Sequence, residues 1–293
     1  MAVRSTKKTT RYGAAGLPLL PLGIRDTNKT HLIEGIVPER NKDDIVLSPS
    51  NVRSFVALLQ EFRQADRLRR HGLEIRSKLL FCGPPGCGKT ITAEAFAFEL
   101  GLPLYVAKLD MIISSFLGET ASNLRKVFEA AANQPSVLFL DEFDALARAR
   151  TDSSEHNELR RVVNSLLQMI DRHRTRGFLI AATNLEESLD TAIWRRFDEV
   201  ILFDLPKERE IRSFLRLKTK NFPTHFDIDD KISKLIGLSY ADIERICTNA
   251  IKRSILKDAR RIAESDFNIA IREELRRQSI RVAVRKAVQR IAD

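Results

Sequence analysis

The segment from Gly83 to Thr90 constrains this chain more than any other. It reads Gly83-Pro84-Pro85-Gly86-Cys87-Gly88-Lys89-Thr90 and fits the pattern G-x-x-x-x-G-K-[ST], whose glycines let backbone N–H groups curl around phosphate oxygens. An apolar run at 78–82 predicts a buried strand before it, and 91–100 predicts a helix after it. The helix N-terminus adds a positive dipole end, Lys89 is expected to reach the β- and γ-phosphates, and the Thr90 hydroxyl to bind Mg²⁺. The segment therefore predicts nucleotide binding rather than a plain Gly-Pro turn.

Strand and helix patterns alternate on both sides of this segment. The expected strands are apolar runs at 78–82, 104–108, 137–141, 178–183 and 200–205, and the helices between them fall near 91–100, 122–132 and 157–170. This alternation is typical of an α/β fold with a parallel sheet sandwiched by helices. Sites in such sheets gather at the carboxyl ends of the strands.

The flanking regions have a different composition. Residues 1–49 are expected to form a basic, flexible arm, and 51–70 a helix before the first strand. After Pro206 only helical patterns follow, at 207–222, 229–236, 240–256 and 265–277. We therefore expect a large nucleotide-binding domain over 50–206, a small helical domain over 207–271 and a basic helical extension over 272–293.

The composition of the 293 residues limits the class of protein. Apolar residues make up 43% and charged residues 30%, and no apolar stretch is long enough to span a bilayer, so a cytoplasmic protein is expected. Three widely spaced cysteines favour neither a disulfide framework nor a zinc site. The net charge of +10 favours an anionic partner, either nucleic acid or an acidic protein.

Polar side chains follow two of the expected strands. Asp141 and Glu142 end the apolar run at 137–141, where Asp141 would join the Mg²⁺ shell and Glu142 would polarise the attacking water. Asn184 follows the run at 178–183 and could orient this water or contact the γ-phosphate, although such an Asn often only caps a helix.

Two adjacent arginines follow further along the chain. Arg195 and Arg196 suit charge stabilisation of a transferring phosphoryl group, an effect worth roughly 10³–10⁵ in rate. The alternative is that they pair with Asp198 or Glu199 at the surface.

Taken together, these motifs resemble the AAA family of AAA+ ATPases, in particular its protein-remodelling and unfolding clade, over residues 51–277. The phosphate-loop segment is similar to Walker A, 137–144 to Walker B, Asn184 to sensor 1, and Arg195 and Arg196 to arginine fingers. Residues 237–242 resemble the start of a small-domain helix that usually reads Ser-Gly-Ala-Asp. Tyr240 stands in place of that Gly, so nucleotide contacts there stay open.

The resemblance implies a P-loop NTPase αβα sandwich followed by a small helical AAA lid domain. It implies Mg²⁺-dependent ATP hydrolysis in a ring of identical subunits, usually a hexamer. In such a ring Arg195 and Arg196 would act on the nucleotide of the adjacent subunit.

The segment Phe116-Leu117-Gly118 resembles the pore loop with which this clade grips a polypeptide in the central channel. The alternative is that Phe116 packs into its own core. Residues 151–156 would form a second, more polar pore loop. The implied partner is a protein substrate, with a separate protease or effector protein as a further candidate.

Two other functions stay open from the sequence. The net charge and the arginine-rich C-terminus favour a nucleic-acid-associated AAA+ motor, loader or regulator as the second choice. A slowly hydrolysing assembly switch is the third, and the presence of Asp141, Glu142, Asn184 and both arginines speaks against it.

Overall fold

The computed structural model describes residues 24–25, 31–114, 120–145, 156–174, 176–184 and 191–292. Its contacts divide the chain into two compact units. The first comprises Met1–Ile45, Pro49–Pro84 and Lys89–Phe203, and the second comprises Val46–Ser48, Pro85–Gly88 and Asp204–Asp293.

The first unit is built on a β-sheet. Over the described residues its strand order is β1-β2-β4-β5-β6-β3-β7. The pairs among β4, β5, β6, β3 and β7 are parallel, whereas β1–β2 and β2–β4 are antiparallel. The bounds are β1 (Ile24–Arg25), β2 (His31–Ile36), β3 (Lys78–Cys82), β4 (Leu104–Lys108), β5 (Val137–Asp141), β6 (Phe178–Thr183) and β7 (Glu199–Leu202).

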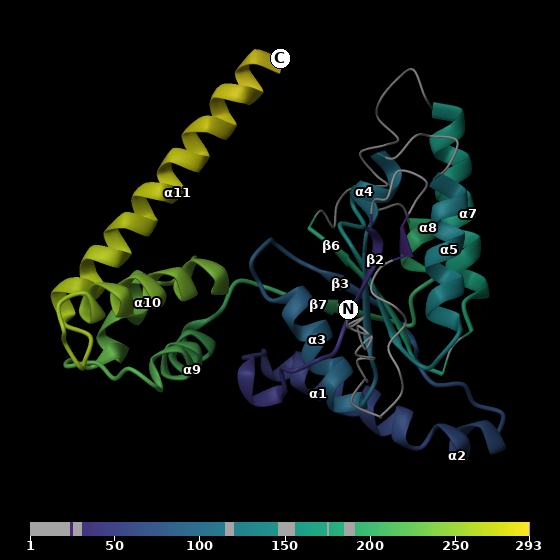
Figure 1. Cartoon of the computed structure of the whole chain (residues 1–293), viewed down its shortest axis with the longest axis horizontal. Helices are drawn as coiled ribbons and strands as arrows, with labels where there is room; N and C mark the ends of the chain where they lie inside the picture. Colours follow the sequence, from purple (N-terminus) through teal and green to yellow (C-terminus); the bar gives the residue numbers. More distant parts are fainter. Residues whose placement is uncertain are drawn as a thin grey trace, which may run out of the picture. The chain divides into compact units, whose positions relative to one another are not determined.

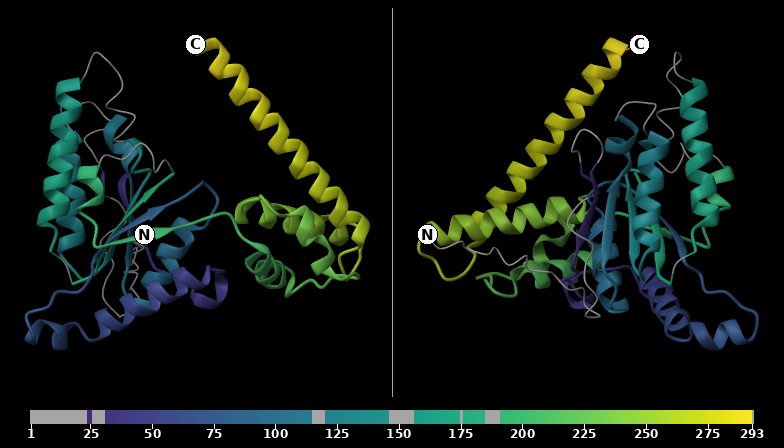
Figure 2. Two further views of the ribbon diagram at one scale, coloured as in Figure 1. Left: turned by 180° about the vertical axis from the view of Figure 1, so that it is seen from behind. Right: turned by 45° about the vertical axis from the view of Figure 1, so that its right-hand side comes forward.

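Helices cover both faces of this sheet, with α1 and α3 on one face and α5 and α7 on the other (Figures 1 and 2). Four of the five residues of β3 are apolar, and these four are buried. Leu80 and Cys82 join the core beneath α5 and α7, whereas the ring of Phe81 lies 5.8 Å from that of Phe55 in α1. The helices are η1 (Lys42–Asp44), α1 (Pro49–Arg63), α2 (Ala65–Arg70), α3 (Lys89–Leu100), α4 (Leu109–Ser114), α5 (Thr120–Ala132), α7 (His156–Arg172) and α8 (Thr191–Trp194).

The α/β class and the parallel strands agree with the sequence prediction, and three details differ. The last strand is Glu199–Leu202 rather than 200–205. The helix expected over 51–70 is two helices that meet at Gln64. The largest difference is β2, because residues 1–49 were expected to lie outside the packed domain. β2 pairs with β4 and buries Leu32 and Ile33, so this part of the segment belongs to the sheet.

The second unit is helical over its described residues, with α9 (Glu208–Thr219), the 3₁₀ helix η3 (Ile228–Lys234), α10 (Tyr240–Ile255) and α11 (Glu264–Ala292). Apolar side chains of all four elements form its core. As expected, the C-terminal extension continues the last helix, and α11 runs on past α9 and α10 (Figure 1). Its Ile280, Val282 and Val284 are each more than half exposed, so over these residues it does not pack against a neighbouring element as expected. Within the described part of the chain, no helix is both long and apolar enough to cross a membrane.

Candidate active site

The phosphate-loop segment joins the end of β3 to the start of α3. Gly83 has a φ of +140°, and an ideal Cβ at this position would lie 2.1 Å from the carbonyl oxygen of Phe203. The Phe203 N–H donates to the Cys82 carbonyl at 2.7 Å, so the chain leaving β7 runs directly along the start of the loop. Only glycine fits at position 83, because a side chain would meet backbone there.

Lys89 is the first residue of α3 and is buried, with 7% of its surface exposed. Its Nζ donates to the carbonyl oxygens of Gly83 at 2.5 Å and Pro84 at 3.1 Å, and to Oδ1 of Asn184 at 2.7 Å. These three oxygens are neutral, and they hold the ammonium group at the loop. The structure thereby brings Lys89 and Asn184 together from the ends of two neighbouring strands, β3 and β6.

Thr90 and Asp141 also meet. The Thr90 hydroxyl donates to Oδ2 of Asp141 at 3.3 Å, and Asp141 is the last residue of β5. A hydroxyl and a carboxylate are both oxygen ligands of the kind that Mg²⁺ takes. The described residues contain no group of three or more His, Cys, Asp or Glu that could hold a metal by themselves. The pair fits a Mg²⁺ ion that completes its shell with phosphate oxygens and water.

Glu142 turns the chain sharply away from β5. It has a φ of +56°, which is uncommon for a residue other than glycine and costs conformational energy. Its N–H donates to Oδ1 of Asp141 at 2.9 Å, and the next N–H, of Phe143, donates to the Ala182 carbonyl at 2.8 Å. These two bonds hold the turn and fix where the Glu142 side chain begins.

Other carboxylates surround Glu142. Burial raises the pKa of its side chain, and so do a hydrogen bond to Asp110 and the charges of Asp110, Asp141 and Asp144. Asp144 is buried and its Oδ1 accepts the backbone N–H of Asn184 at 3.3 Å. A carboxylate with a raised pKa is the stronger base.

Asp110 and Asp144 were not singled out from the sequence. The strand pairing holds a signal for Asp110, because Lys108 of β4 lies opposite Asp141 of β5 and the next residues of both strands leave the sheet at the same end. Asp144 lies within the Walker B-like segment, but a carboxylate three residues beyond the strand carries no sign of burial in the sequence.

The two arginines follow α8. Arg195 is exposed, and the Arg196 Nε donates to Oδ2 of Asp171 at 3.2 Å. Asp171 lies near the end of α7, so this ion pair ties Arg196 to an element that does not carry the phosphate loop. The alternative expected from the sequence is that the arginines pair with Asp198 or Glu199. Oδ2 of Asp198 accepts the N–H groups of Ser77 and Lys78, and Glu199 forms an ion pair with Arg76.

The first expected pore loop, and all of the second except His156 at the start of α7, fall outside the described residues. Phe116, Leu117 and Gly118 lie between the end of α4 at Ser114 and the start of α5 at Thr120. Residues 151–155 precede α7.

The tip of the phosphate loop, Pro85–Gly88, belongs to the second unit. The Gly86 carbonyl accepts the N–H of Ala241 at 3.1 Å, and a Cβ at position 86 would lie 2.7 Å from Oγ of Ser239. Ser239 caps α10 in a reciprocal pair of hydrogen bonds with Asp242. The loop tip therefore sits against the N-terminus of α10.

Tyr240 follows this cap, where the resemblance leads one to expect glycine. Its ring packs edge-on against Phe214 of α9, with 4.9 Å between the ring centroids. Burial, together with the charge of Glu210, raises the pKa of its hydroxyl. Tyr240 is thus a packing residue of the helical unit.

This geometry agrees with the similarity of the chain to one family model and to three relatives. Residues 79–205 match the model of the "ATPase family associated with various cellular activities (AAA)". The chain is 56% identical to an uncharacterized AAA family ATPase, y4kL, of Sinorhizobium fredii, over 94% of this chain and 85% of that protein. It is 31% identical to the ATP-dependent zinc metalloprotease FtsH 3 of Sphaerobacter thermophilus, over 80% of this chain and 49% of that protein. It is 36% identical to a 26S proteasome regulatory subunit homolog of Methanothermobacter marburgensis, over 67% of this chain and 54% of that protein.

The chain thus spans about half the length of the latter two relatives and most of the first. The match to the first relative is long and 56% identical. The phosphate loop and the carboxylates at the sheet edge agree with it, and together they identify the family of this chain. It belongs to the AAA family of ATPases.

Proposed function

We propose that the site built around Lys89 carries out Mg²⁺-dependent hydrolysis of ATP. The observation that supports this most directly is the convergence of side chains from separate strands on the phosphate loop. Lys89 donates a hydrogen bond to Asn184, which follows β6. Thr90 donates a hydrogen bond to Asp141, the last residue of β5. A phosphate group needs donors and a metal-binding oxygen pair at the same place, and this arrangement supplies both.

Each residue of this site has a distinct task in the proposed reaction. The backbone N–H groups of 83–88 and the N-terminus of α3 bind the phosphates, and Lys89 exchanges its carbonyl partners for phosphate oxygens. Thr90 and Asp141 would hold Mg²⁺, which would supply positive charge to neutralise the charge that develops on the phosphate group.

The hydrolytic water would lie between Glu142 and Asn184. Glu142 takes the proton from this water, which its raised pKa favours. Asn184 orients the water and the terminal phosphate through its amide, and its bond to Lys89 links that orientation to the phosphates themselves.

Arg195 and Arg196 complete the site from a neighbouring copy of the chain. Two features support this: Arg195 is exposed, and Arg196 is tied to Asp171 rather than to the loop of its own chain. The assembly we propose is a ring, most simply a hexamer. Relatives named as FtsH and as a proteasome regulatory subunit homolog are consistent with such an assembly.

The work done by this ring is, in our proposal, the remodelling or unfolding of protein substrates drawn through a central pore by Phe116, Leu117 and Gly118. The named relatives include a protease and a proteasome regulatory subunit homolog, which supports a protein substrate and a separate protease or effector as partner. Residues 50–206 would be the nucleotide-binding domain, 207–271 the lid and 272–293 a basic extension.

The test is the steady-state ATPase rate across protein concentration, with an unfolded protein, with DNA, and with neither. Phe116→Ala is run beside the wild type, and Met111→Ala serves as control because Met111 is an exposed apolar residue of the preceding helix α4. We expect the rate per subunit to rise with concentration, and stimulation by unfolded protein to be lost in Phe116→Ala alone. Stimulation by DNA that is insensitive to Phe116 would instead favour the nucleic-acid motor.

A further inference from the structure

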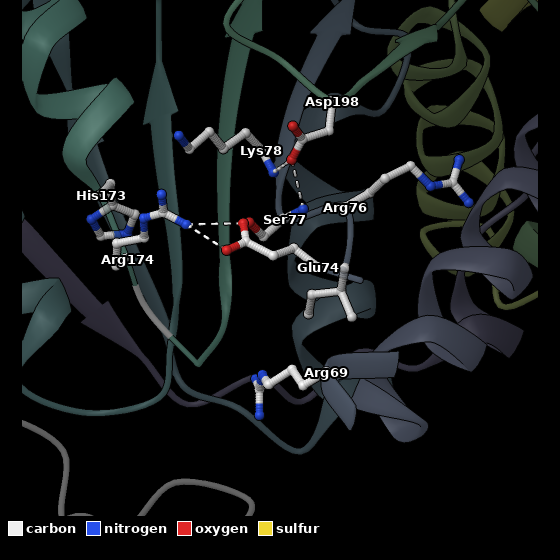
Figure 3. Close-up of a pocket in the computed structure, with 9 residues that line it drawn as sticks. Arg69, Glu74, Arg76, Ser77, Lys78, His173, Arg174 and Asp198 are labelled. Carbon is white, nitrogen blue, oxygen red and sulfur yellow. Dashed lines mark hydrogen bonds and ion pairs between the residues drawn. The ribbon is translucent and has the colours of Figure 1, made fainter. Parts of the chain in front are cut away.

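A pocket of about 400 Å³ lies at the opposite end of the strands from the phosphate loop. It forms where three segments converge: residues 74–78 before and at the start of β3, His173 and Arg174 after α7, and Asp198 before β7. These segments meet because β6, β3 and β7 are neighbours and begin at the same end of the sheet. Figure 3 shows the side chains that line the pocket.

The floor of the pocket is fixed by backbone bonds. Oδ2 of Asp198 accepts the N–H groups of Ser77 and Lys78, each at 2.9 Å, and the Asp198 N–H donates to the Lys78 carbonyl at 2.8 Å. The Asp198 carboxylate is thereby committed to the backbone, so the pocket keeps its shape when other groups move.

An exposed ion pair between two lining residues also contributes to the pocket. Arg174 Nη1 bonds both carboxylate oxygens of Glu74, at 2.8 and 2.9 Å, reaching across the pocket from the side of α7 (Figure 3). The two side chains are 75% and 79% exposed, and exposed pairs of this kind contribute little to stability. Glu74 lies in the loop before β3, two residues after Gly72, whose φ is +74°. The carboxylate of Glu74 can therefore leave Arg174 at small cost.

Two further polar groups lie at the pocket. Lys78 Nζ has three N–H groups and donates to the Asp171 carbonyl at 3.2 Å. His173 is 8% exposed, and its Nε2 is buried without a hydrogen-bond partner. Burial and the charge of Lys78 lower the pKa of His173 to about 4, so the imidazole is neutral at pH 7 and can donate through one nitrogen.

The side chains of the pocket that could still bind a ligand are hydrogen-bond donors. Oδ2 of Asp198 accepts backbone N–H groups, whereas Arg174 and Lys78 line the pocket with cationic side chains. Arg69 also lines the pocket, but its Nη1 is paired with Oδ1 of Asp66 at 2.8 Å. Guanidinium groups prefer planar or tetrahedral oxyanions that two N–H groups can grip together. Glu74 already presents such a group to Arg174.

We propose that this pocket is an oxyanion site, in which Arg174 and Lys78 hold a carboxylate or phosphate group of a small ligand that displaces Glu74. The volume suits a small metabolite or the end of a short peptide rather than a lone ion. The site lies at the far end of the sheet from the residues proposed for ATP hydrolysis, so its ligand is distinct from the nucleotide.

The test uses ligand-observed NMR, which detects weak ligands on a large assembly. The 293-residue chain, saturated with ADP and Mg²⁺, is titrated at constant ionic strength with two anions. Binding of succinate is followed by saturation transfer, and binding of inorganic phosphate by ³¹P line width. The variants are Glu74→Gln, which removes the competing carboxylate, and Arg174→Gln, which removes the guanidinium. Arg172→Gln is the matched control, because Arg172 is exposed at the end of α7 and does not line the pocket.

We expect Glu74→Gln to bind more tightly than the wild type, and Arg174→Gln to bind at least about tenfold more weakly, the value of a charged hydrogen bond. Arg172→Gln should match the wild type. Binding of succinate alone identifies a carboxylate ligand, and binding of phosphate alone identifies a phosphate ligand. The proposal is overturned if Glu74→Gln binds neither anion, or if Arg174→Gln binds them as tightly as the wild type.

Discussion

Replacing Gly83 by alanine tests whether the neighbouring strand fixes the shape of the phosphate loop. The added Cβ would lie 2.1 Å from the Phe203 carbonyl oxygen and 2.9 Å from its carbon, on a residue whose φ is +140°. A strained backbone of this kind costs about 1–3 kcal/mol, and forcing an extra carbon into packed backbone about 1–3 kcal/mol more. We therefore expect Gly83→Ala to lower the free energy of unfolding by about 2–6 kcal/mol.

Gly101→Ala is the matched control. Gly101 follows α3 in the same unit and has a φ of +69°, but nothing lies within 4 Å of its Cβ position. Its replacement carries the backbone strain alone, about 1–2 kcal/mol. The difference between the two variants combines the clash with Phe203 and the difference in strain between a φ of +140° and one of +69°.

Trp194 offers a suitable probe, because it is the single tryptophan and packs against the core of the first unit, which contains both glycines. Urea unfolding followed by its fluorescence gives the stability of each variant, and a fluorescent ATP analogue gives nucleotide affinity. We expect Gly83→Ala to lose both and Gly101→Ala to keep its affinity. Equal losses of stability in the two variants, or unchanged affinity in Gly83→Ala, would refute the argument from Phe203.

Further predictions concern the catalytic groups and the pocket. Glu142→Gln should bind ATP normally and hydrolyse it at least about a hundredfold more slowly, the value of a general base, as a radioactive phosphate-release assay would show; normal turnover would remove Glu142 from its role. Arg195→Ala should slow hydrolysis by roughly 10³ while keeping ATP affinity. Mixing it with Glu142→Gln should restore part of the activity, since some interfaces then combine an intact Glu142 with an intact Arg195; no restoration would speak against action between subunits. Folding lowers the pKa of His173 from 6.5 to about 4, so the unfolded chain binds a proton at this residue more readily than the folded chain does. The free energy of unfolding is therefore unaffected by this group above pH 6.5 and falls by up to about 3 kcal/mol as the pH drops toward 4. His173→Phe should remove this part of the pH dependence in urea unfolding, and an unchanged pH profile would show that His173 is not buried in its neutral form.

The strands and the phosphate loop could be predicted because their signals are local. β3, β5 and β6 are covered by helices on both faces, so each is an unbroken apolar run that ends at a polar residue or glycine. The carboxyl ends of parallel neighbours meet at the same edge, which is how Asp141 and Asn184 could be assigned to one site.

The features that escaped prediction depend on contacts far along the chain. β2 is a strand of six residues, and Glu34 and Gly35 separate its apolar residues Leu32 and Ile33 from Ile36. Gly35 lies against the ring of Tyr105, which would be 3.2 Å from a Cβ at this position. The positive φ of Glu142 and the position of Asp110 beside it likewise follow from how β4 and β5 end together, which no local pattern records.

The phosphate loop shows which structural features a local sequence motif can predict and which it cannot. Gly83 is confined by Phe203, Gly86 by Ser239, and Lys89 is bonded to Asn184, and each of these partners lies 95 residues or more further along the chain. A loop held by such distant partners acquires its shape only after the strands and helix that carry them have assembled, because the entropy of closing those long loops must first be offset by packing. The motif is therefore sufficient to identify the loop in the sequence, but a fragment that ends before β6 should retain the motif and fail to bind nucleotide.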